Sequence, residues 1–220
     1  MFGRSAIIVT LLAAFSLAVP LGAKTNDDRV KTAALLTAGG PSLLPEAGEY
    51  VPVPGAYGLV EPVDGFVAHA TKKRFGIYIT PETSPVKGDR FKGFHTGVDA
   101  EFEDTPGDVA VRAIADGTVV LAKWVNGYGG LIVIRHSIAG MPVFALYGHL
   151  DEATFPPNLA TVTRGQTIAM LGDDHSHETD GVRKHLHFSI YAGEKVDYRG
   201  YVPNQEDLAS WRDPLDFFAQ

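Results

Sequence analysis

Two histidines stand two positions apart in the stretch KHLHF, residues 184–188. The residues around them alternate between polar and apolar types, which is typical of a β-strand. In a strand, His185 and His187 point to one face, while Leu186 and Phe188 point to the other, toward a core. Two imidazoles on one face suit metal binding or proton transfer. The alternative is an ordinary pair of surface or partly buried histidines.

Two other segments carry residue types that bind metals. HTGVD holds His95 and Asp99, and its glycine favours a bent strand or loop over a helix. YGHL places His149 at the end of an apolar run. A catalytic zinc ion takes three protein ligands, often two histidines and a carboxylate, and keeps a fourth position for water. The three segments together contain the side chains for such a site.

Short strands must position these residues. Apolar runs rich in β-branched and aromatic residues alternate with turns that contain glycine, which predicts a mostly antiparallel β architecture. A short helix is expected near the C-terminus, interrupted by Pro214. The strands are predicted within residues 116–125, 131–136, 141–150, 161–172 and 184–194.

The composition sets limits on function. The chain has 220 residues, 45% of them hydrophobic and 20% charged, which is typical of a globular protein. Its net charge of -7 and the lack of a basic block argue against nucleic acid as a partner. The absence of cysteine excludes disulfides and thiolate zinc sites, so any metal must be held by His, Asp or Glu.

The N-terminal region is organised differently from the rest. Residues 1–23 have a charged start, an apolar middle and small residues at the end, which predicts a signal peptide. A retained N-terminal anchor is the alternative, and both place the remaining chain outside the cytoplasm. Residues 24–65 are rich in Gly and Pro and are predicted to be a linker or a propeptide-like segment that occludes the site. Residues 66–220 are predicted to form the folded domain.

The three motifs, in this order, resemble those of the lysostaphin-type (LytM-like) zinc metallopeptidases, which cut peptide bonds in peptidoglycan. The similarity covers about residues 73–192. It implies the fold of these enzymes, a mainly antiparallel β-sheet or sandwich (a duplicated hybrid motif) with long loops and little helix. Further stretches that resemble the family are AVRAIADGTVV (110–120), NGYGGLIVIRH (126–136) and VTRGQTIAMLG (162–172).

The resemblance also implies roles for individual residues. It makes His95, Asp99 and His187 the ligands of Zn²⁺. It makes His149 and His185 the catalytic pair that orients water and stabilises the tetrahedral intermediate. Leu186 and Phe188 would then face the core, which answers why a strand carries two histidines side by side.

The chain departs from the family pattern at several positions. The loop before HLHF is long and acidic, and its His175 and His177 suggest either a second metal site with Asp173 and Asp174 or, as we expect, a solvated loop. Tyr78 is a candidate for stabilising the oxyanion or contacting substrate, or else a core or rim residue.

Other side chains near the motifs have structural alternatives. Arg183 and Lys184 are expected to be a surface pair, although they are also placed to meet a substrate carboxylate. Trp124 and Tyr128 are expected either to form a wall of the groove or to cap the sheet. His136 is expected to be structural.

These observations predict a secreted or periplasmic zinc metalloendopeptidase with peptidoglycan stem peptides or cross-links as its substrate. No stable membrane association is expected once the signal peptide is removed. One alternative is a non-catalytic or weakly catalytic module that binds and activates other cell-wall hydrolases. Another is a zinc peptidase with a protein substrate. The bond that is cut, whether a D,D cross-link or a glycine bridge, stays open.

Overall fold

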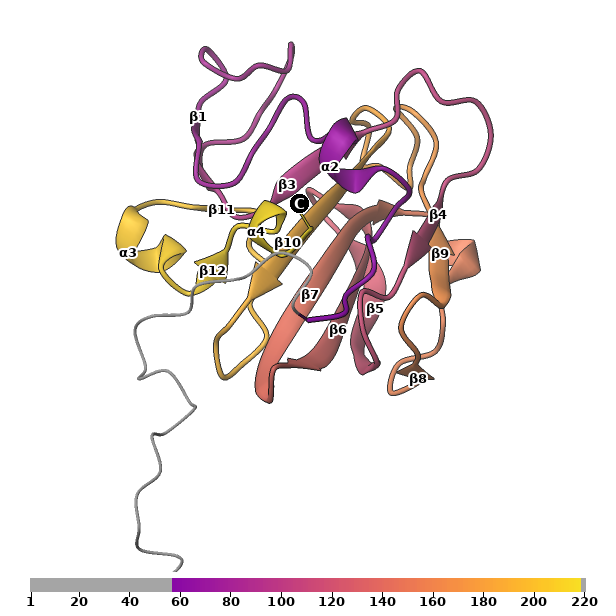
Figure 1. Ribbon diagram of the computed structural model, residues 1–220. Coiled ribbons are helices and arrows are strands. Elements are labelled where there is room, and N and C mark those ends of the chain that lie inside the picture. The colour runs from indigo at the N-terminus through magenta and orange to yellow at the C-terminus, as the bar shows by residue number, and fades with distance from the viewer. Residues whose placement is uncertain (1–56, 219–220) are drawn as a thin grey trace, which may run out of the picture. The chain divides into compact units, whose positions relative to one another are not determined.

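The computed structural model describes residues 57–218 of the chain (Figure 1). The predicted signal peptide, residues 1–23, lies outside the described residues, as do residues 24–56 of the predicted linker. All strand pairings in the described part are antiparallel. Helices are few and short, so the mainly antiparallel β fold predicted from the sequence is confirmed.

The largest element is a seven-stranded sheet with the order β12-β10-β7-β6-β5-β8, in which β3 also pairs with β10. Strands β5, β6 and β7 form a meander, drawn side by side in Figure 1, and β10 continues it. The seven strands are β3 (Val98–Glu101), β5 (Gly117–Val125), β6 (Gly129–Ile138), β7 (Met141–Leu150), β8 (Thr161–Val162), β10 (His185–Tyr191) and β12 (Trp211–Arg212).

Two small sheets flank the large one. The first has the order β1-β2-β11, with β1 (Tyr78–Ile79), β2 (Gly93–His95) and β11 (Tyr201–Val202). The second pairs β4 (Ala110–Arg112) with β9 (Thr167–Met170).

The helices are all short. They are α2 (Phe66–His69), the 3₁₀ helix η1 (Glu152–Thr154), α3 (Gln205–Leu208) and α4 (Leu215–Phe218). The sequence predicted one short helix near the C-terminus; the structure has two, one on each side of Pro214, which cannot continue a helix.

Strand β6 is buried on both faces over most of its length. Leu131, Ile132, Val133 and Ile134 of β6 are all fully buried, so this strand reads as a continuous apolar run rather than an alternating one. The turn between β6 and β7 is a tight two-residue connection, with positive φ at Ala139 and Gly140. Turns of this kind match the twist of the strands they join.

The two sheet faces have different neighbours. On one face, Phe188 of β10 packs against Phe66 of α2 and Tyr147 of β7, with ring centroids 5.4 and 5.1 Å apart. Leu186 and Phe188 are both buried, as the alternation predicted. A cluster on the opposite face reaches toward the histidines and consists of Tyr128, Leu131, Val133, Phe144, Leu146 and Trp211.

The packed domain starts earlier than residue 66. The Val60 amide donates to the Ile114 carbonyl at 3.1 Å, Val63 is fully buried, and Arg112 pairs with Asp64 at 2.6 Å. Residues 57–65, assigned above to the linker, are therefore part of the described domain. The hypothesis of an occluding segment now concerns residues 24–56, which lie outside the described residues.

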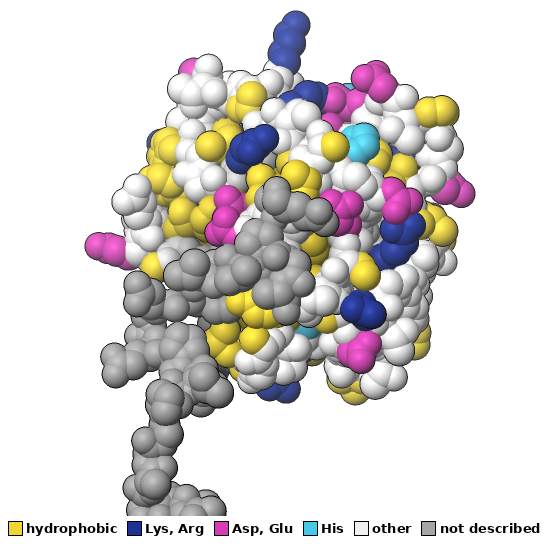
Figure 2. Space-filling view, in the orientation of Figure 1, with side chains coloured by type: hydrophobic (Ala, Val, Ile, Leu, Met, Phe, Trp, Pro, Cys, Tyr) yellow, Lys and Arg dark blue, Asp and Glu magenta, His cyan; other side chains and the backbone are white. Residues whose placement is uncertain are grey.

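Charged side chains of both signs are interspersed on the face shown in Figure 2. Within residues 57–218, none of the helices has the length and apolar character that a membrane span requires.

Candidate metal centre and active site

The pairing of β3 with β10 brings most of the motif residues together. His187 lies directly opposite Asp99, and His185 lies opposite Glu101. Residues directly opposite each other in an antiparallel pair project from the same face, and so do residues two apart in one strand. Four polar side chains therefore gather on one face, and all four are buried.

His95 reaches the same point from β2. Its strand pairs with β11, where Tyr201 lies opposite His95, and the chain then turns through Thr96 and Gly97 into β3. The bent arrangement predicted for residues 95–99 is the one observed. His95 Nε2 lies 3.1 Å from His187 Nδ1 and 3.2 Å from Asp99 Oδ1, and His187 Nδ1 lies 3.1 Å from Asp99 Oδ1.

The hydrogen bonds of the two imidazoles fix which nitrogens face this point. His95 Nδ1 lies 3.2 Å from the Arg74 carbonyl, which only accepts, so Nδ1 carries the proton and Nε2 of the neutral ring has a lone pair. His187 Nε2 lies 2.8 Å from Ser189 Oγ; a ring that donates to this hydroxyl leaves Nδ1 unprotonated. Two ring nitrogens and a carboxylate oxygen thus converge, and with His187 donating to Ser189 both nitrogens carry a lone pair.

This donor set fits a zinc ion. A tetrahedral ion with bonds of about 2.0–2.1 Å separates two of its ligand atoms by about 3.3–3.4 Å. The three observed separations of 3.1–3.2 Å are close to this value. Among the described residues, His95, Asp99 and His187 are the one group of His, Asp and Glu side chains arranged closely enough to hold a metal ion.

A β-bulge aims His149 at the same centre. In the pairing of β6 with β7, Leu131 lies opposite Gly148 and Gly130 lies opposite Leu150. His149, between these two residues of β7, therefore has no partner in β6. Its φ of 67° is in the left-handed region. An extra residue of this kind breaks the alternation of the strand and redirects its side chain, which is why bulges are frequent beside active sites.

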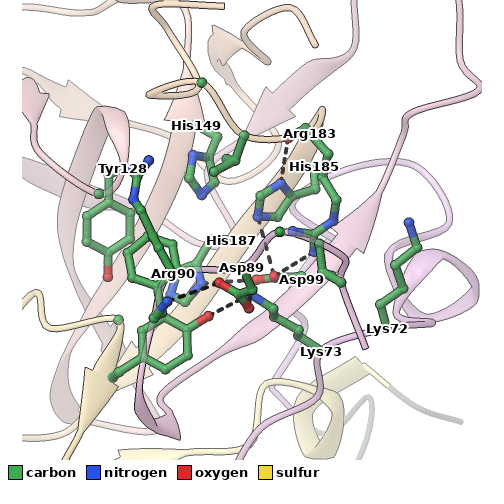
Figure 3. Close-up of a pocket in the computed structure, with 18 of the residues that line it drawn as sticks. Lys72, Lys73, Asp89, Arg90, Asp99, Tyr128, His149, Arg183, His185 and His187 are labelled. Atoms are coloured by element: carbon green, nitrogen blue, oxygen red, sulfur yellow. Dashed lines mark hydrogen bonds and ion pairs between the residues drawn. The ribbon is translucent and has the colours of Figure 1, made fainter. Parts of the chain in front are cut away.

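His149 and His185 lie side by side, with ring centroids 4.2 Å apart, above Asp99 in Figure 3. Burial, reinforced by His187, lowers the pKa of His149 to about 3. Burial also holds the pKa of His185 well below its ordinary value, against the opposing effect of Asp99. Both rings are therefore neutral near pH 7.

His185 has one defined tautomer. Its Nδ1 lies 2.8 Å from the Arg183 carbonyl and must donate to it, which leaves a lone pair on Nε2, 3.4 Å from Asp99 Oδ2. A proton accepted at this Nε2 would create an imidazolium next to a carboxylate.

Asp99 is a charged carboxylate. Burial alone would raise its pKa, but the positive charge that His185 and His95 carry when protonated, together with hydrogen bonds from His187 and His95, holds the pKa of Asp99 well below its usual range. Its second oxygen, Oδ2, accepts a hydrogen bond of 2.8 Å from Arg183 Nη2.

The site opens into a cavity of about 660 Å³. Asp99, His149, His185 and His187 line its floor, whereas His95 is fully buried behind them. One wall comes from residues 85–91 and the other from residues 125–128 and the loop around 181–183. Arg90 pairs with Asp180 and so joins the two walls.

Tyrosines other than the predicted one line this cavity. Tyr78 is 45% exposed, packs edge-on against Phe94 and is not among the lining residues, so the structure does not bring it to the site. Tyr128 and Tyr201 do line the cavity. The Tyr128 hydroxyl is buried without a hydrogen-bond partner among the described residues.

Tyr201 is held in place from two sides. Its hydroxyl accepts a 2.9 Å hydrogen bond from Lys73 Nζ, and its ring stacks on Phe91 with centroids 5.1 Å apart. Lys73 in turn forms a buried ion pair of 2.5 Å with Asp89. Tyr201 was missed in the sequence because only its pairing with His95, more than a hundred positions away, brings it to the site.

The loop before β10 does not assemble a second metal site in the described residues. His177 stacks on Trp124, His175 Nδ1 bonds to the Gly181 carbonyl, and Asp174 accepts from the Lys184 amide. These contacts stabilise the conformation of the loop, which agrees with the expectation of a solvated loop. Trp124 also donates to the His177 carbonyl at 3.2 Å, so it anchors this loop.

The prediction that Arg183 and Lys184 form a surface pair is wrong. Both side chains are buried: Arg183 is bonded to Asp99 and Glu101, and Lys184 Nζ donates to the Gly107 carbonyl at 2.5 Å. The signal was present in the sequence. Extending the two-residue period of HLH by one step each way gives Arg183 and Ser189.

His136 lies away from the cavity. Its Nδ1 lies 3.0 Å from the Asp116 carbonyl, and burial lowers its pKa. Its position between two strands of the sheet agrees with the structural role expected for it.

Comparison with known proteins identifies relatives for part of the chain. It is 42% identical over 62 residues to the murein hydrolase activator EnvC of Escherichia coli, a stretch that covers 28% of this chain and 14% of that protein. It is 34% identical over 142 residues to an uncharacterized protein of Haemophilus influenzae, covering 64% of this chain and 28% of the other. The chain thus spans less than a third of the length of these curated relatives.

One solved structure matches part of the chain. Csd3 of Helicobacter pylori shares 19% sequence identity, with a TM-score of 0.46, over 74% of this chain and 35% of the Csd3 chain.

Residues 93–198 match the description of peptidase family M23. The matched segment contains all five motif residues, from His95 in β2 to His187 in β10. This agrees with the resemblance stated from the sequence. The folded part of this chain is therefore a member of peptidase family M23, of the LytM-like type.

Proposed function

We propose that the protein is a zinc metalloendopeptidase that hydrolyses peptide bonds in the stem peptides or cross-links of peptidoglycan. One observation carries the proposal. Three ligand atoms of His95, Asp99 and His187 converge at 3.1–3.2 Å from one another, directly beside two neutral histidines at the floor of a cavity. This arrangement has the parts of a metal-assisted hydrolase.

The residues of the site have different roles in the proposed reaction. His95, Asp99 and His187 would hold the zinc ion, which supplies Lewis-acid chemistry by polarising the scissile carbonyl and lowering the pKa of water to about 7. His185 Nε2 has the free lone pair and is placed to accept the proton of the attacking water. His149, a neutral ring beside it, is placed to hydrogen-bond the oxygen on which negative charge develops.

The cavity suits a peptide. A volume of about 660 Å³ holds several residues in extended form, and its walls mix aromatic and charged side chains, among them Phe91, Tyr201 and Arg90. The relationship to a murein hydrolase activator supports peptidoglycan over an unrelated protein as the substrate. We further propose that the protein acts in the cell envelope, on the basis of the signal-like residues 1–23.

A second candidate is activation of another wall hydrolase, which the name of the Escherichia coli relative favours. That role needs no metal and no catalytic histidines. Four of the five motif side chains line one cavity and His95 completes the ligand group directly behind them, which supports catalysis instead.

The test is digestion of purified peptidoglycan sacculi by the full chain, its His149→Ala variant and a His69→Gln control. His69 stacks on Phe102 and does not line the cavity. The parent and the control should release muropeptides cut at a peptide bond, identified by mass spectrometry. Loss of a proton-transfer or oxyanion group should slow His149→Ala by about 10²- to 10⁴-fold while zinc stays bound.

The products decide between the candidates. Cleaved peptide bonds name the substrate and the bond. If the zinc-bound parent releases nothing, yet speeds the release of fragments by a separately added wall hydrolase, the activator role replaces the proposal.

A further inference from the structure

We propose that Arg183 is a positioning residue of the metal centre, which holds the Asp99 carboxylate so that a single oxygen faces the metal. The proposal rests on the proposed zinc site and adds a residue that affects zinc binding without being a ligand. Arg183 lies close to Asp99 and His185 in Figure 3, and its guanidinium bonds to Asp99 and Glu101 rather than to the two ligand histidines.

The contacts of Arg183 are specific. Its Nη2 donates to Asp99 Oδ2 at 2.8 Å, while Nε and Nη2 donate to the two oxygens of Glu101, both at 2.6 Å. The side chain is 5% exposed, so these bonds are protected from water. Because the guanidinium is planar and clamped by Glu101 on one edge, its direction toward Asp99 is fixed.

The two oxygens of Asp99 therefore have different neighbours. Oδ1 lies within 3.2 Å of both His95 Nε2 and His187 Nδ1. Oδ2 is occupied by Arg183 and faces His185 Nε2 at 3.4 Å. A metal held at the ligand cluster would thus meet Oδ1 of Asp99, while Oδ2 stays bonded to Arg183.

Arg183 positions the base as well. Its backbone carbonyl accepts from His185 Nδ1 at 2.8 Å, which fixes the tautomer of that ring. One residue therefore orients a ligand through its side chain and the catalytic histidine through its backbone. Partners of this kind typically change metal affinity by 10- to 100-fold when removed.

Two opposing electrostatic effects have to be separated. A positive guanidinium repels a metal ion, so its loss would strengthen binding if charge dominated. However, Glu101 offsets this charge at 2.6 Å, which leaves orientation as the larger effect. Removing Arg183 alone would also leave the buried Glu101 carboxylate with Lys72, 3.8 Å away, as its remaining ion-pair partner among the described residues, and would destabilise the fold.

The experiment therefore uses a double variant of the full chain. In Arg183→Met with Glu101→Met, both members of the ion pair become apolar, a replacement that is often neutral or stabilising for the fold. Zinc affinity is measured by competition with a chromophoric chelator for the parent, the double variant and an Arg112→Met control, whose ion pair with Asp64 lies away from the site. Circular dichroism and thermal melting check that each protein is folded.

The proposal predicts that the folded double variant binds zinc about 10- to 100-fold more weakly than the parent, with the control unchanged. It also predicts a weaker visible absorption of bound cobalt(II), because the freed Oδ2 adds a ligand to the four-coordinate ion. Zinc affinity and a cobalt spectrum equal to those of the parent would overturn the positioning role and leave a structural ion pair. If the parent itself binds no zinc, the proposed function fails together with this inference.

Discussion

At the scale of single residues, the site is a row of side chains selected by the two-residue period of a strand. Arg183, His185, His187 and Ser189 follow one another on one face of β10, and Asp99 lies opposite His187 on β3. The Arg183 carbonyl fixes the tautomer of His185, and the Ser189 hydroxyl holds Nε2 of His187 at 2.8 Å. The histidines are therefore ordered before a metal or substrate arrives.

Burying neutral histidines makes the metal-free protein sensitive to acid. The pKa of His149 is about 3 when folded, against about 6.5 for a histidine in an unfolded chain. Between these values the unfolded state binds a proton that the folded state does not. Stability is thus complete above about pH 6.5 and falls as the pH drops toward 3, by up to about 1.4 kcal/mol per pH unit for this group.

This prediction is checked by urea unfolding of the chelator-treated chain at a series of pH values between 7.5 and 4. His149→Asn should flatten the dependence of unfolding free energy on pH. His175→Asn is the control, because His175 also has a positive φ, of 51°, but an exposed side chain. Equal slopes for the parent and His149→Asn would contradict the account.

At the scale of elements, a bulge and close-packed glycines join the loops to the sheet. Gly129 has a φ of +65°, and a Cβ there would lie 1.9 Å from the Glu178 carbonyl oxygen. The same carbonyl accepts a 3.0 Å hydrogen bond from the Gly130 amide. The loop that carries Asp180 and lines the cavity is therefore fixed to the start of β6 by close backbone contact.

Substitution of Gly129 tests this contact. In Gly165, φ is +79° and nothing lies within 4 Å of a Cβ, so Gly165→Ala carries only the strain of a left-handed backbone, about 1–2 kcal/mol. Gly129→Ala has the same strain and also overlaps with Glu178, so it should destabilise the fold by at least about 2 kcal/mol more. Urea unfolding of the two variants measures the difference in unfolding free energy. An equal loss in both variants would show that the loop around Glu178 moves aside without a measurable loss of stability.

Most of the large sheet could be predicted from the sequence, and the short elements could not. Strands β5, β6 and β7 have nine or ten residues, enough for β-branched composition and glycine turns to mark them. Strands β1, β11 and β12 have two residues each, which is too short for any period to be recognised. They form because the rest of the fold supplies a partner edge.

The same distinction holds for the site. The motifs pointed to five residues that the structure brings together. They did not point to Tyr201, which lies at the site because β11 pairs with β2. The wrong expectation for Arg183 came from treating charge as a sign of exposure. In this fold an adjacent strand supplies Glu101 and Asp99 as partners, so the charge is buried and paired.

At the scale of the whole molecule, the described domain combines a seven-stranded sheet with a cavity lined by residues of its strands. His95 lies on the small β1-β2-β11 sheet, and the large sheet carries Asp99, His149, His185 and His187. A metal held across both sheets would link them, so its removal should lower the stability of the whole domain.

The central claim is that His95, Asp99 and His187 hold one zinc ion. The most direct measurement is the metal content per chain, by plasma mass spectrometry, of the full-length protein, His187→Ala and His149→Ala after equilibration with zinc and removal of the excess. The account predicts about one zinc per chain in the parent and in His149→Ala, and none in His187→Ala. A parent without zinc, or a His187→Ala variant that keeps it, would contradict the ligand assignment and the mechanism built on it.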